Sequence, residues 1–386
     1  MSSKHLIKTS ILLFSLLQLG VMVISPNLAS IARELPNNSI TTIQLLATFP
    51  DIVIVITSLI CGRLLSWISQ KRLALLSCFL FVVVAIGGYL FHTDLVVLFL
   101  WSTLLGIAIG ILMPVAIAMI NQEFIGAQKT KLIGLQNTFV GLGAVILLII
   151  GGMLSLIEWY YSYLAYLLIL PALIFILFYI KDVRPEKPES SIRKKPTYAL
   201  VLYYSIVVFI FFSLYNALPI NISMLLVEKG ISGNINATIL VIALMLGSSL
   251  SGVLFNYLLV IFKHNTLKLG FILLLIGSLL IATTHQLYLM VIGMFVAGSS
   301  LSVVMAYATM TISKRENKQA VNGSIAIMLA ASACGGFFTS FYTNIYLNIY
   351  KTTSFSKILL MISLITLISL FILIIFDFKK FTTNCK

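Results

Sequence analysis

The residue with the clearest capacity for chemistry is Asp51, which lies inside a long apolar segment. This segment spans about residues 42–66, so Asp51 is only a few residues from the middle of a ~20-residue membrane crossing. An ionised carboxylate is costly there, and intramembrane acids usually face a cavity or mark a proton or substrate path. Asp51 is therefore a candidate proton-coupling or cation-binding acid. The alternative is a position near the outer headgroups after Pro50, paired with Arg33 or solvated.

The other acidic residues and the cysteines offer less chemistry. Glu34, Asp94, Glu158 and Glu228 fall at outer segment ends, where we expect solvated carboxylates without a special role. The four cysteines form no CxxC pair, which predicts neither a disulfide framework nor a metal site. HExxH, GxSxG and Walker A patterns are absent from the sequence, so we predict no enzyme activity, no metal and no cofactor.

Uncharged polar residues recur inside the apolar segments. Because lipid offers no hydrogen-bond partner, each buried amide must find one in the protein or its ligand. Interhelical hydrogen bonds and substrate contacts are the two interpretations. The amides in question include Gln18, Asn27, Gln136, Asn137 and Asn216.

These residues are carried by an unusually apolar chain. Hydrophobic residues make up 60% of its 386 positions and charged residues 9%, against roughly 25% in a soluble domain. The composition predicts an all-α membrane protein with twelve transmembrane helices, at about 8–32, 42–66, 72–92, 95–120, 131–155, 159–180, 198–226, 235–262, 267–284, 286–312, 319–347 and 354–376.

The basic residues predict the orientation. With the N-terminus inside, only four of the 25 Lys and Arg residues fall in outer loops, namely Arg33, Lys229, Lys351 and Lys357. Both termini are then cytoplasmic. The net charge of +14 is explained by these short inner loops, so we predict no nucleic-acid partner.

A repeat predicts two related halves. Gly62 and Gly252 each lie near the end of a segment, and Gly134 and Gly323 keep almost the same separation, which is close to half of the chain. The charged, proline-containing stretch KDVRPEKPESSIRKKP separates the halves. The expected organisation is an N-terminal six-helix bundle (1–180), a cytoplasmic linker (181–197) and a C-terminal six-helix bundle (198–386), and such halves face one another across a central cavity in secondary transporters.

Several motifs resemble the major facilitator superfamily, and most closely its bacterial multidrug-efflux members. The run Gly62-Arg63-Leu64-Leu65-Ser66, followed by Lys71-Arg72, is similar to the loop motif between the second and third helices. The fourth segment, LLGIAIGILMPVAIAMI, resembles the glycine-rich helix of drug exporters. The residues expected to act in conformational change are Gly62, Arg63, Ser66, Lys71, Arg72, Gly106, Gly110, Pro114, Gly252 and Asn256.

The resemblance implies two pseudo-symmetric bundles around a central cavity, a monomer, a bacterial cell membrane and a proton gradient as energy source. It also implies a largely apolar substrate cavity. The candidate lining residues are Gln18, Met22, Asn27, Met113, Gln136, Asn137, Phe211, Tyr215, Asn216 and Tyr307.

The sequence departs from the family pattern at positions that matter for coupling. Ser66 and Trp67 replace the usual Asp and Arg of the loop motif, and Ser102 replaces the arginine expected in the fourth helix. The leading hypothesis is proton-coupled export of small hydrophobic or weakly polar compounds. Uptake by symport or facilitated diffusion is one alternative, and a non-transporting membrane sensor on a transporter scaffold is another.

Overall fold

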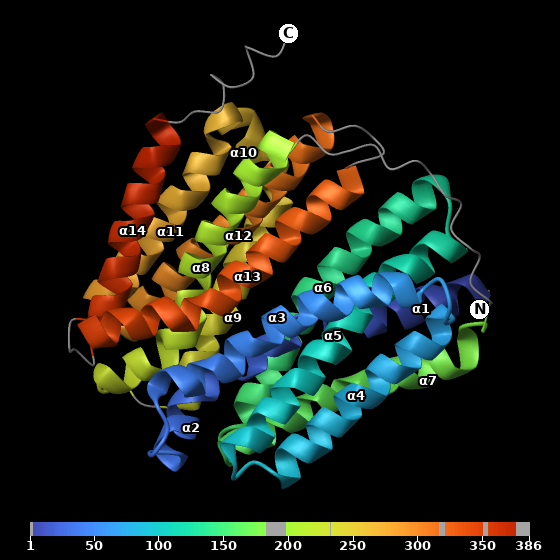
Figure 1. Cartoon of the computed structure of the whole chain (residues 1–386), viewed down its shortest axis with the longest axis horizontal. Helices are drawn as coiled ribbons and strands as arrows, with labels where there is room; N and C mark the ends of the chain where they lie inside the picture. The colour runs from blue at the N-terminus through green and yellow to red at the C-terminus, as the bar shows by residue number, and fades with distance from the viewer. Residues whose placement is uncertain (1–2, 183–197, 232, 316–320, 350–353, 376–386) are drawn as a thin grey trace. The chain divides into compact units, whose positions relative to one another are not determined.

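The computed structural model describes residues 3–182, 198–231, 233–315, 321–349 and 354–375, and among these residues no strand occurs. Helices lie at all twelve expected places (Figure 1), so the predicted all-α class is confirmed. The expected 181–197 linker falls mostly outside the described residues. The chain divides into two compact units, which we call the N-terminal and C-terminal units.

The N-terminal unit comprises Met1–Ile192 together with the short stretches Ile222–Val227 and Ser232–Thr238. Its helices are α1 (Ser3–Ser15), η1 (Gly20–Val23), η2 (Ser25–Asn27), α2 (Leu28–Glu34), α3 (Ile40–Leu64), α4 (Gln70–Leu90), α5 (Leu95–Glu123), α6 (Gly126–Leu154), η3 (Trp159–Ile169) and α7 (Leu170–Tyr179).

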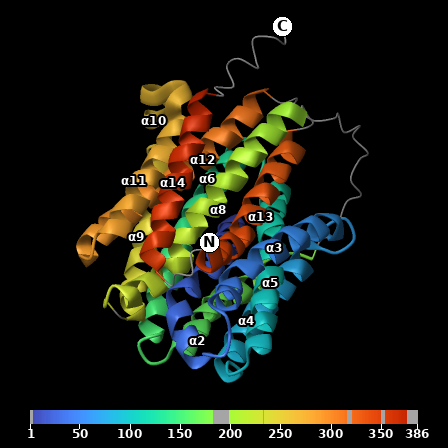
Figure 2. The ribbon, with the colours of Figure 1, turned by 60° about the vertical axis from the view of Figure 1, so that its left-hand side comes forward.

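The C-terminal unit comprises Arg193–Asn221, Glu228–Ile231 and Ile239–Lys386. The remaining helices of the chain are α8 (Tyr198–Glu228), α9 (Asn234–Val253), α10 (Phe255–Phe262), η4 (Lys263–Asn265), α11 (Thr266–Thr283), α12 (Leu287–Arg315), α13 (Val321–Ile349) and α14 (Phe355–Ile375). Helices α11 and α14 pack side by side within this unit (Figure 2).

The chain is a multi-pass membrane protein by length and hydropathy. Within the described residues, ten spans are long and apolar enough to cross a bilayer, and an eleventh is bent. Residues Thr138–Leu154 of α6 form a shorter apolar helix at the remaining expected place. Three expected helices are not continuous: the first is broken near residues 16–19, the sixth begins as a 3-10 helix, and the eighth breaks at Leu254.

Hydroxyl and carboxyl side chains set the starts of three helices in the N-terminal unit. Ser39 accepts a hydrogen bond from the Thr42 amide, and Ser69 caps α4 in the same way. Asp94 caps α5 by accepting from the Val96 amide at 2.8 Å. These caps satisfy backbone donors that the first helical turn leaves free. Asp94 is exposed at a helix end, as expected, and its carboxylate caps the helix in addition.

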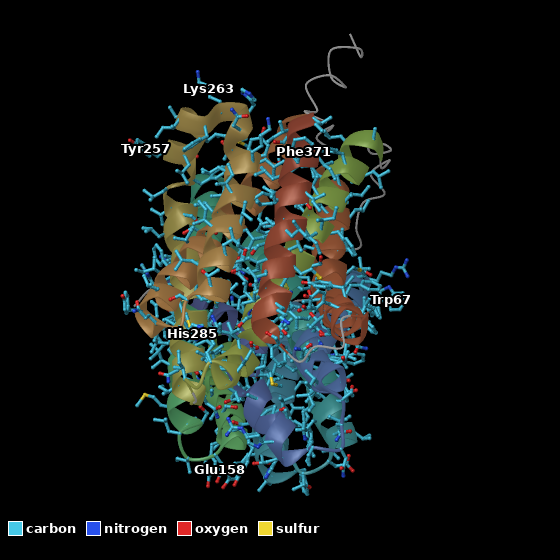
Figure 3. The ribbon with its side chains drawn as sticks, turned by 90° about the vertical axis from the view of Figure 1, so that its left-hand side faces the viewer. Trp67, Glu158, Tyr257, Lys263, His285 and Phe371 are labelled. Atoms are coloured by element: carbon cyan, nitrogen blue, oxygen red, sulfur yellow. The ribbon has the colours of Figure 1, made fainter. Side chains whose placement is uncertain are left out.

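Large apolar side chains point outward, as lipid permits. Trp67, Tyr257 and Phe371 project from the ribbon (Figure 3) and are 81%, 67% and 63% exposed. In water, exposed apolar surface on this scale would be a liability. In a bilayer it is the surface that faces the acyl chains.

The two units repeat the same helix crossings at glycines. A Cβ on Gly143 of α6 would lie 2.0 Å from the Leu16 carbonyl oxygen. At the corresponding place in the second half of the chain, a Cβ on Gly335 of α13 would lie 2.3 Å from the Phe209 carbonyl oxygen of α8. Only glycine permits so close an approach, which is typical of membrane helix packing.

A second pair of crossings keeps the same separation in sequence as Gly143 and Gly335. A Cβ on Gly106 of α5 would lie 2.7 Å from Val53 Cβ of α3, and one on Gly298 of α12 would lie 1.9 Å from the Leu244 carbonyl oxygen of α9. The pseudo-symmetry expected from the sequence repeat is therefore present in the internal packing of each unit.

Candidate functional site

The first membrane span is interrupted where Gln18 lies. The helix axis bends by 45° between Lys4–Ser15 and Gly20–Glu34. The break frees backbone groups, and the Tyr166 hydroxyl donates to the Gly20 carbonyl at 3.0 Å. Gln18 Oε1 is buried in this break without a hydrogen-bond partner among the described residues. Broken membrane helices often form ligand sites because they expose polar groups at membrane depth.

Asn27 supplies a second partly satisfied amide on the same span. Its Nδ2 donates to the Val23 carbonyl and to Ser162 Oγ, both at 3.1 Å, which is the interhelical contact that one interpretation predicted. Its Oδ1 is buried and has no partner within the described part of the chain. An unsatisfied buried acceptor costs about 1–3 kcal/mol, so both amides are candidates for contact with water or substrate.

Asp51 lies on α3, turned away from α5. Val53 and Thr57 of α3 face Gly106 and Gly110 of α5, and helical geometry places Asp51 about 160° around the axis from Val53. The side chain is half-buried, and no hydrogen bond or ion pair joins it to another described residue. The alternative pairing with Arg33 is therefore absent from the described structure.

Two residues missed at the sequence level share the Asp51 side of α3. Gln44 and Thr48 lie seven and three positions earlier, which puts all three side chains on one face of the helix. Gln44 and Thr48 are buried. The i, i+4, i+7 spacing of polar residues was the available signal, and it defines a polar face on an otherwise apolar helix.

On α5, the fourth span, Ser102 replaces the expected arginine and has a structural role. Ser102 is buried and donates to the Leu46 carbonyl of α3 at 3.0 Å. On the same helix, Gly110 allows α5 to pack closely against α3, since a Cβ at this position would lie 2.7 Å from Thr57 Cβ. Met113 and Pro114 are half-buried farther along.

The remaining N-terminal candidates differ in burial. Met22 is half-buried on η1, and Gln136 is buried on α6. The side chain of Asn137 lies outside the described residues. All of these remain predictions as substrate contacts.

In the C-terminal unit, the predicted cavity residues lie in an aromatic cluster. Phe211 is completely buried, with ring centroids 5.8 Å from Tyr215 and 5.5 Å from Phe271 of α11. The Tyr215 hydroxyl is buried without a partner among the described residues. Asn216 is buried on α8, and Tyr307 is half-buried on α12.

An apolar groove of about 400 Å³ adjoins this cluster. Phe271 lines it on α11, together with residues of α8 and α14: Ala199, Leu202, Tyr203, Ile206, Val207, Ile210, Ser369, Ile372 and Leu373. Its size matches sites for small organic ligands. Its walls would accept an apolar molecule and would bind a multiply charged one poorly.

The loop motif forms an exposed clip within the N-terminal unit. Arg72 Nε pairs with Asp182 Oδ2 at 3.0 Å, and Lys71 Nζ donates to the Leu177 carbonyl at 2.7 Å. A hydrogen bond with Ser69, and then Arg72, lower the pKa of Asp182 below its usual value. The clip joins the start of α4 to the end of α7.

The other motif residues make few contacts. Gly62 and Arg63 are exposed, and Ser66 Oγ donates to the Arg63 carbonyl. Gly252 and Asn256 are also exposed, on α9 and α10.

Glu228 and Lys229 cap two other helices in the C-terminal unit, which the sequence reading missed. Glu228 accepts from Ser354 Oγ and from the backbone amides of Phe355 and Ser356 at the start of α14. Lys229 Nζ donates to the Ile281 and Ala282 carbonyls at 2.8 and 2.9 Å, at the end of α11. Each charge meets the helix end of opposite polarity, so the expectation of a merely solvated Glu228 is wrong.

Repeated halves, a broken first span and glycine crossings together define a polytopic membrane protein of the secondary-transporter class. The family model described as Major Facilitator Superfamily matches residues 11–339, and the chain belongs to this superfamily. No similar sequence was found among curated proteins.

Solved structures agree on the fold. The nucleoside transporter NupG is 10% identical with a TM-score of 0.76, covering 95% of this chain and 99% of that chain. A POT family transporter in complex with a thioalcohol-conjugated peptide is 12% identical with a TM-score of 0.78, covering 97% and 96%. A bacterial homolog of the human lysosomal transporter Spinster is 12% identical with a TM-score of 0.73, covering 96% and 95%.

Proposed function

We propose that this chain exports small hydrophobic or weakly polar compounds in exchange for protons. The observation that carries the proposal is Asp51, a half-buried carboxyl group inside a membrane span without a hydrogen-bond or ion-pair partner among the described residues. A carboxyl group held in this way can gain or lose a proton when its access to water changes. The proton gradient is then the energy source, and no cofactor is required.

The chemistry around the other candidates supports the substrate class. Gln18, Asn27 and Tyr215 each offer a buried polar atom that lacks a partner in the described structure. The groove between α8, α11 and α14 is apolar, but Leu202, Ile206 and Ile372 in its lining are exposed, so it opens on the surface that faces the acyl chains. Few hydrogen-bonding groups and no fixed charge suit an apolar or weakly polar compound. We place the protein in a bacterial cell membrane as a monomer with both termini cytoplasmic.

Proton-coupled or facilitated uptake is the second candidate. Ser102, which stands where drug exporters carry arginine, is occupied in a hydrogen bond to α3. Structural neighbours include a transporter named for nucleosides and a POT family transporter solved in complex with a thioalcohol-conjugated peptide. These likenesses concern the fold, so they leave the uptake substrate open.

The test uses purified protein in liposomes with an imposed pH gradient and a fluorescent lipophilic cation as probe. Asp51→Asn is compared with Glu123→Gln, which makes the same carboxyl-to-amide change at the end of α5. We expect gradient-driven movement in the wild type and in Glu123→Gln, and none in Asp51→Asn. Movement of the probe in all three proteins would support export but would show that Asp51 does not couple it to protons. No movement of the probe in any of the three would contradict the export proposal.

A further inference from the structure

A second pocket, of about 310 Å³, lies in the N-terminal unit between the beginnings of α1 and α6. Lys4, His5 and Lys8 line it from α1, which carries the N-terminus of the chain (Figure 1). The opposite wall consists of Phe124, Gln128, Leu132 and Leu135. The pocket is therefore basic on one side and mainly apolar on the other.

Among the described residues, no acidic group balances the positive charge of this pocket. Lys4 and Lys8 are one helical turn apart, so their side chains share a face of α1. No acidic residue lines the pocket, and neither lysine forms an ion pair within the described part of the chain. Glu123 precedes Phe124 in sequence but is not among the lining residues.

Two helix dipoles add to this charge. The pocket lies at the N-terminal ends of α1 and α6, and neither helix has an acidic residue in its first turn. The residue before α6, Ile125, makes no capping hydrogen bond through its side chain. Helix N-termini carry partial positive charge and favour anions, so lysines at this position are electrostatically unfavourable unless an anion is bound.

The apolar wall indicates what the anion is attached to. Phe124 and Leu132 are 7% and 3% exposed, and Leu135 is half-buried. Lys4 also begins the bent first membrane span, and we expect the ends of a membrane span to meet the lipid headgroups. A ligand with a phosphate group and an acyl chain would meet both walls at once.

We propose that this pocket binds the headgroup of an anionic phospholipid, with the phosphate between Lys4 and Lys8 and the start of an acyl chain against Phe124 and Leu132. Basic pockets between membrane helices bind such headgroups on the cytoplasmic side. The lipid bridges α1 and α6, which also meet at the Gly143 crossing near the break in the first span. This proposal is independent of the transported substrate.

The experiment measures lipid retention by native mass spectrometry of the full chain in detergent. Phosphatidylglycerol and phosphatidylcholine of identical chain length are titrated against the wild type, Lys4→Gln/Lys8→Gln and the matched control Lys263→Gln/Lys268→Gln. The control removes Lys263 of η4 and Lys268 of the first turn of α11. Inorganic phosphate and phosphatidylglycerol are also compared through their effects on the melting temperature of the wild type.

We expect the wild type and the control pair to prefer phosphatidylglycerol, and the Lys4/Lys8 pair to bind it about thirtyfold more weakly. Lys4→Gln alone, on the exposed first turn, should weaken binding about fivefold and serves if the double variant does not fold. Equal binding of phosphatidylcholine, or an equal loss in the control pair, would overturn the proposal. Stabilisation by inorganic phosphate equal to that by phosphatidylglycerol would show an anion site without lipid specificity and would also overturn it.

Discussion

The two units share their helix crossings and differ in their chemistry. Gly106 and Gly143 in the N-terminal unit have counterparts in Gly298 and Gly335, and the separation in sequence is the same for both pairs. Apart from these shared crossings, the N-terminal unit carries Asp51 within a membrane span. It also carries the buried amide oxygens of Gln18 and Asn27, which have no hydrogen-bond partner in the described structure. The C-terminal unit carries the apolar groove between α8, α11 and α14, and each unit has an aromatic cluster, around Trp159 and Tyr163 in one and around Phe211 in the other.

This difference indicates what the repeat constrains. A close crossing tolerates no Cβ, whereas a residue facing a cavity is free to change without loss of packing. The crossings therefore persist in both units, while the carboxyl group of Asp51 lies in the N-terminal unit and the apolar groove in the C-terminal unit. In our account the N-terminal unit handles the proton and the C-terminal unit supplies apolar surface.

The largest effect is expected at the shared crossings. Gly143→Ala and its counterpart Gly335→Ala place a Cβ 2.0 and 2.3 Å from a carbonyl oxygen, so each should lower the free energy of unfolding by about 3 kcal/mol through forced helix displacement. Gly62→Ala is the matched control, because nothing lies within 4 Å of its Cβ. Melting temperatures in detergent measure this, and tolerance in one unit alone would break the equivalence of the crossings.

A smaller loss is expected where the C-terminal unit uses charge for stability. Lys229→Met removes donors to the α11 carbonyls, leaving them unpaired, and should cost about 2 kcal/mol. Lys357→Met, at an exposed lysine on α14, should change stability little. If the two variants melt at the same temperature, the cap on α11 does not stabilise this unit.

Much of this fold was predictable, because it depends on hydropathy summed over long segments. A long apolar segment has one stable form in lipid, and so the twelve helices were found from composition and spacing alone. The break at Gln18 was not predictable, because it depends on partners distant in sequence, such as the Tyr166 hydroxyl.

The candidate site was predictable only in part, for a similar reason. Asp51 was identified because a charge in an apolar run is conspicuous. Gln44 and Thr48 were missed because only their position around the helix axis links them to Asp51. The roles of Glu228 and Lys229 depend on helix ends that are distant from them in sequence.

The buried amides of the N-terminal unit should affect transport more than stability. Gln18→Leu removes an acceptor that has no partner within the described residues, so the melting temperature should stay constant or rise. If Gln18 hydrogen-bonds the substrate, KM should increase about fivefold at unchanged kcat, in line with ~1 kcal/mol. Liposome flux at several substrate concentrations measures both constants, and a lower melting temperature with normal KM would assign Gln18 to structure.

The smallest effect is expected at the exposed clip of the N-terminal unit. The pKa of Asp182 is lowered by hydrogen bonding with Ser69 and by Arg72, so its contribution exists above the unfolded pKa of about 3.9 and is lost on acidification. Asp182→Asn should therefore melt slightly below the wild type at pH 7, and the difference should shrink as the pH falls below about 3.9 and vanish only below the lowered pKa of the folded state. A difference that persists in acid would mean that the carboxylate charge is not the cause.

The most direct test of the division between the units separates exchange from coupling. In liposomes, Asp51→Asn is assayed both for substrate accumulation driven by a pH gradient and for exchange of labelled against unlabelled substrate without a gradient. The account predicts that accumulation is lost while exchange continues, because the substrate surface remains intact and only the proton site is removed. Gradient-driven accumulation at the wild-type rate in Asp51→Asn would contradict the account.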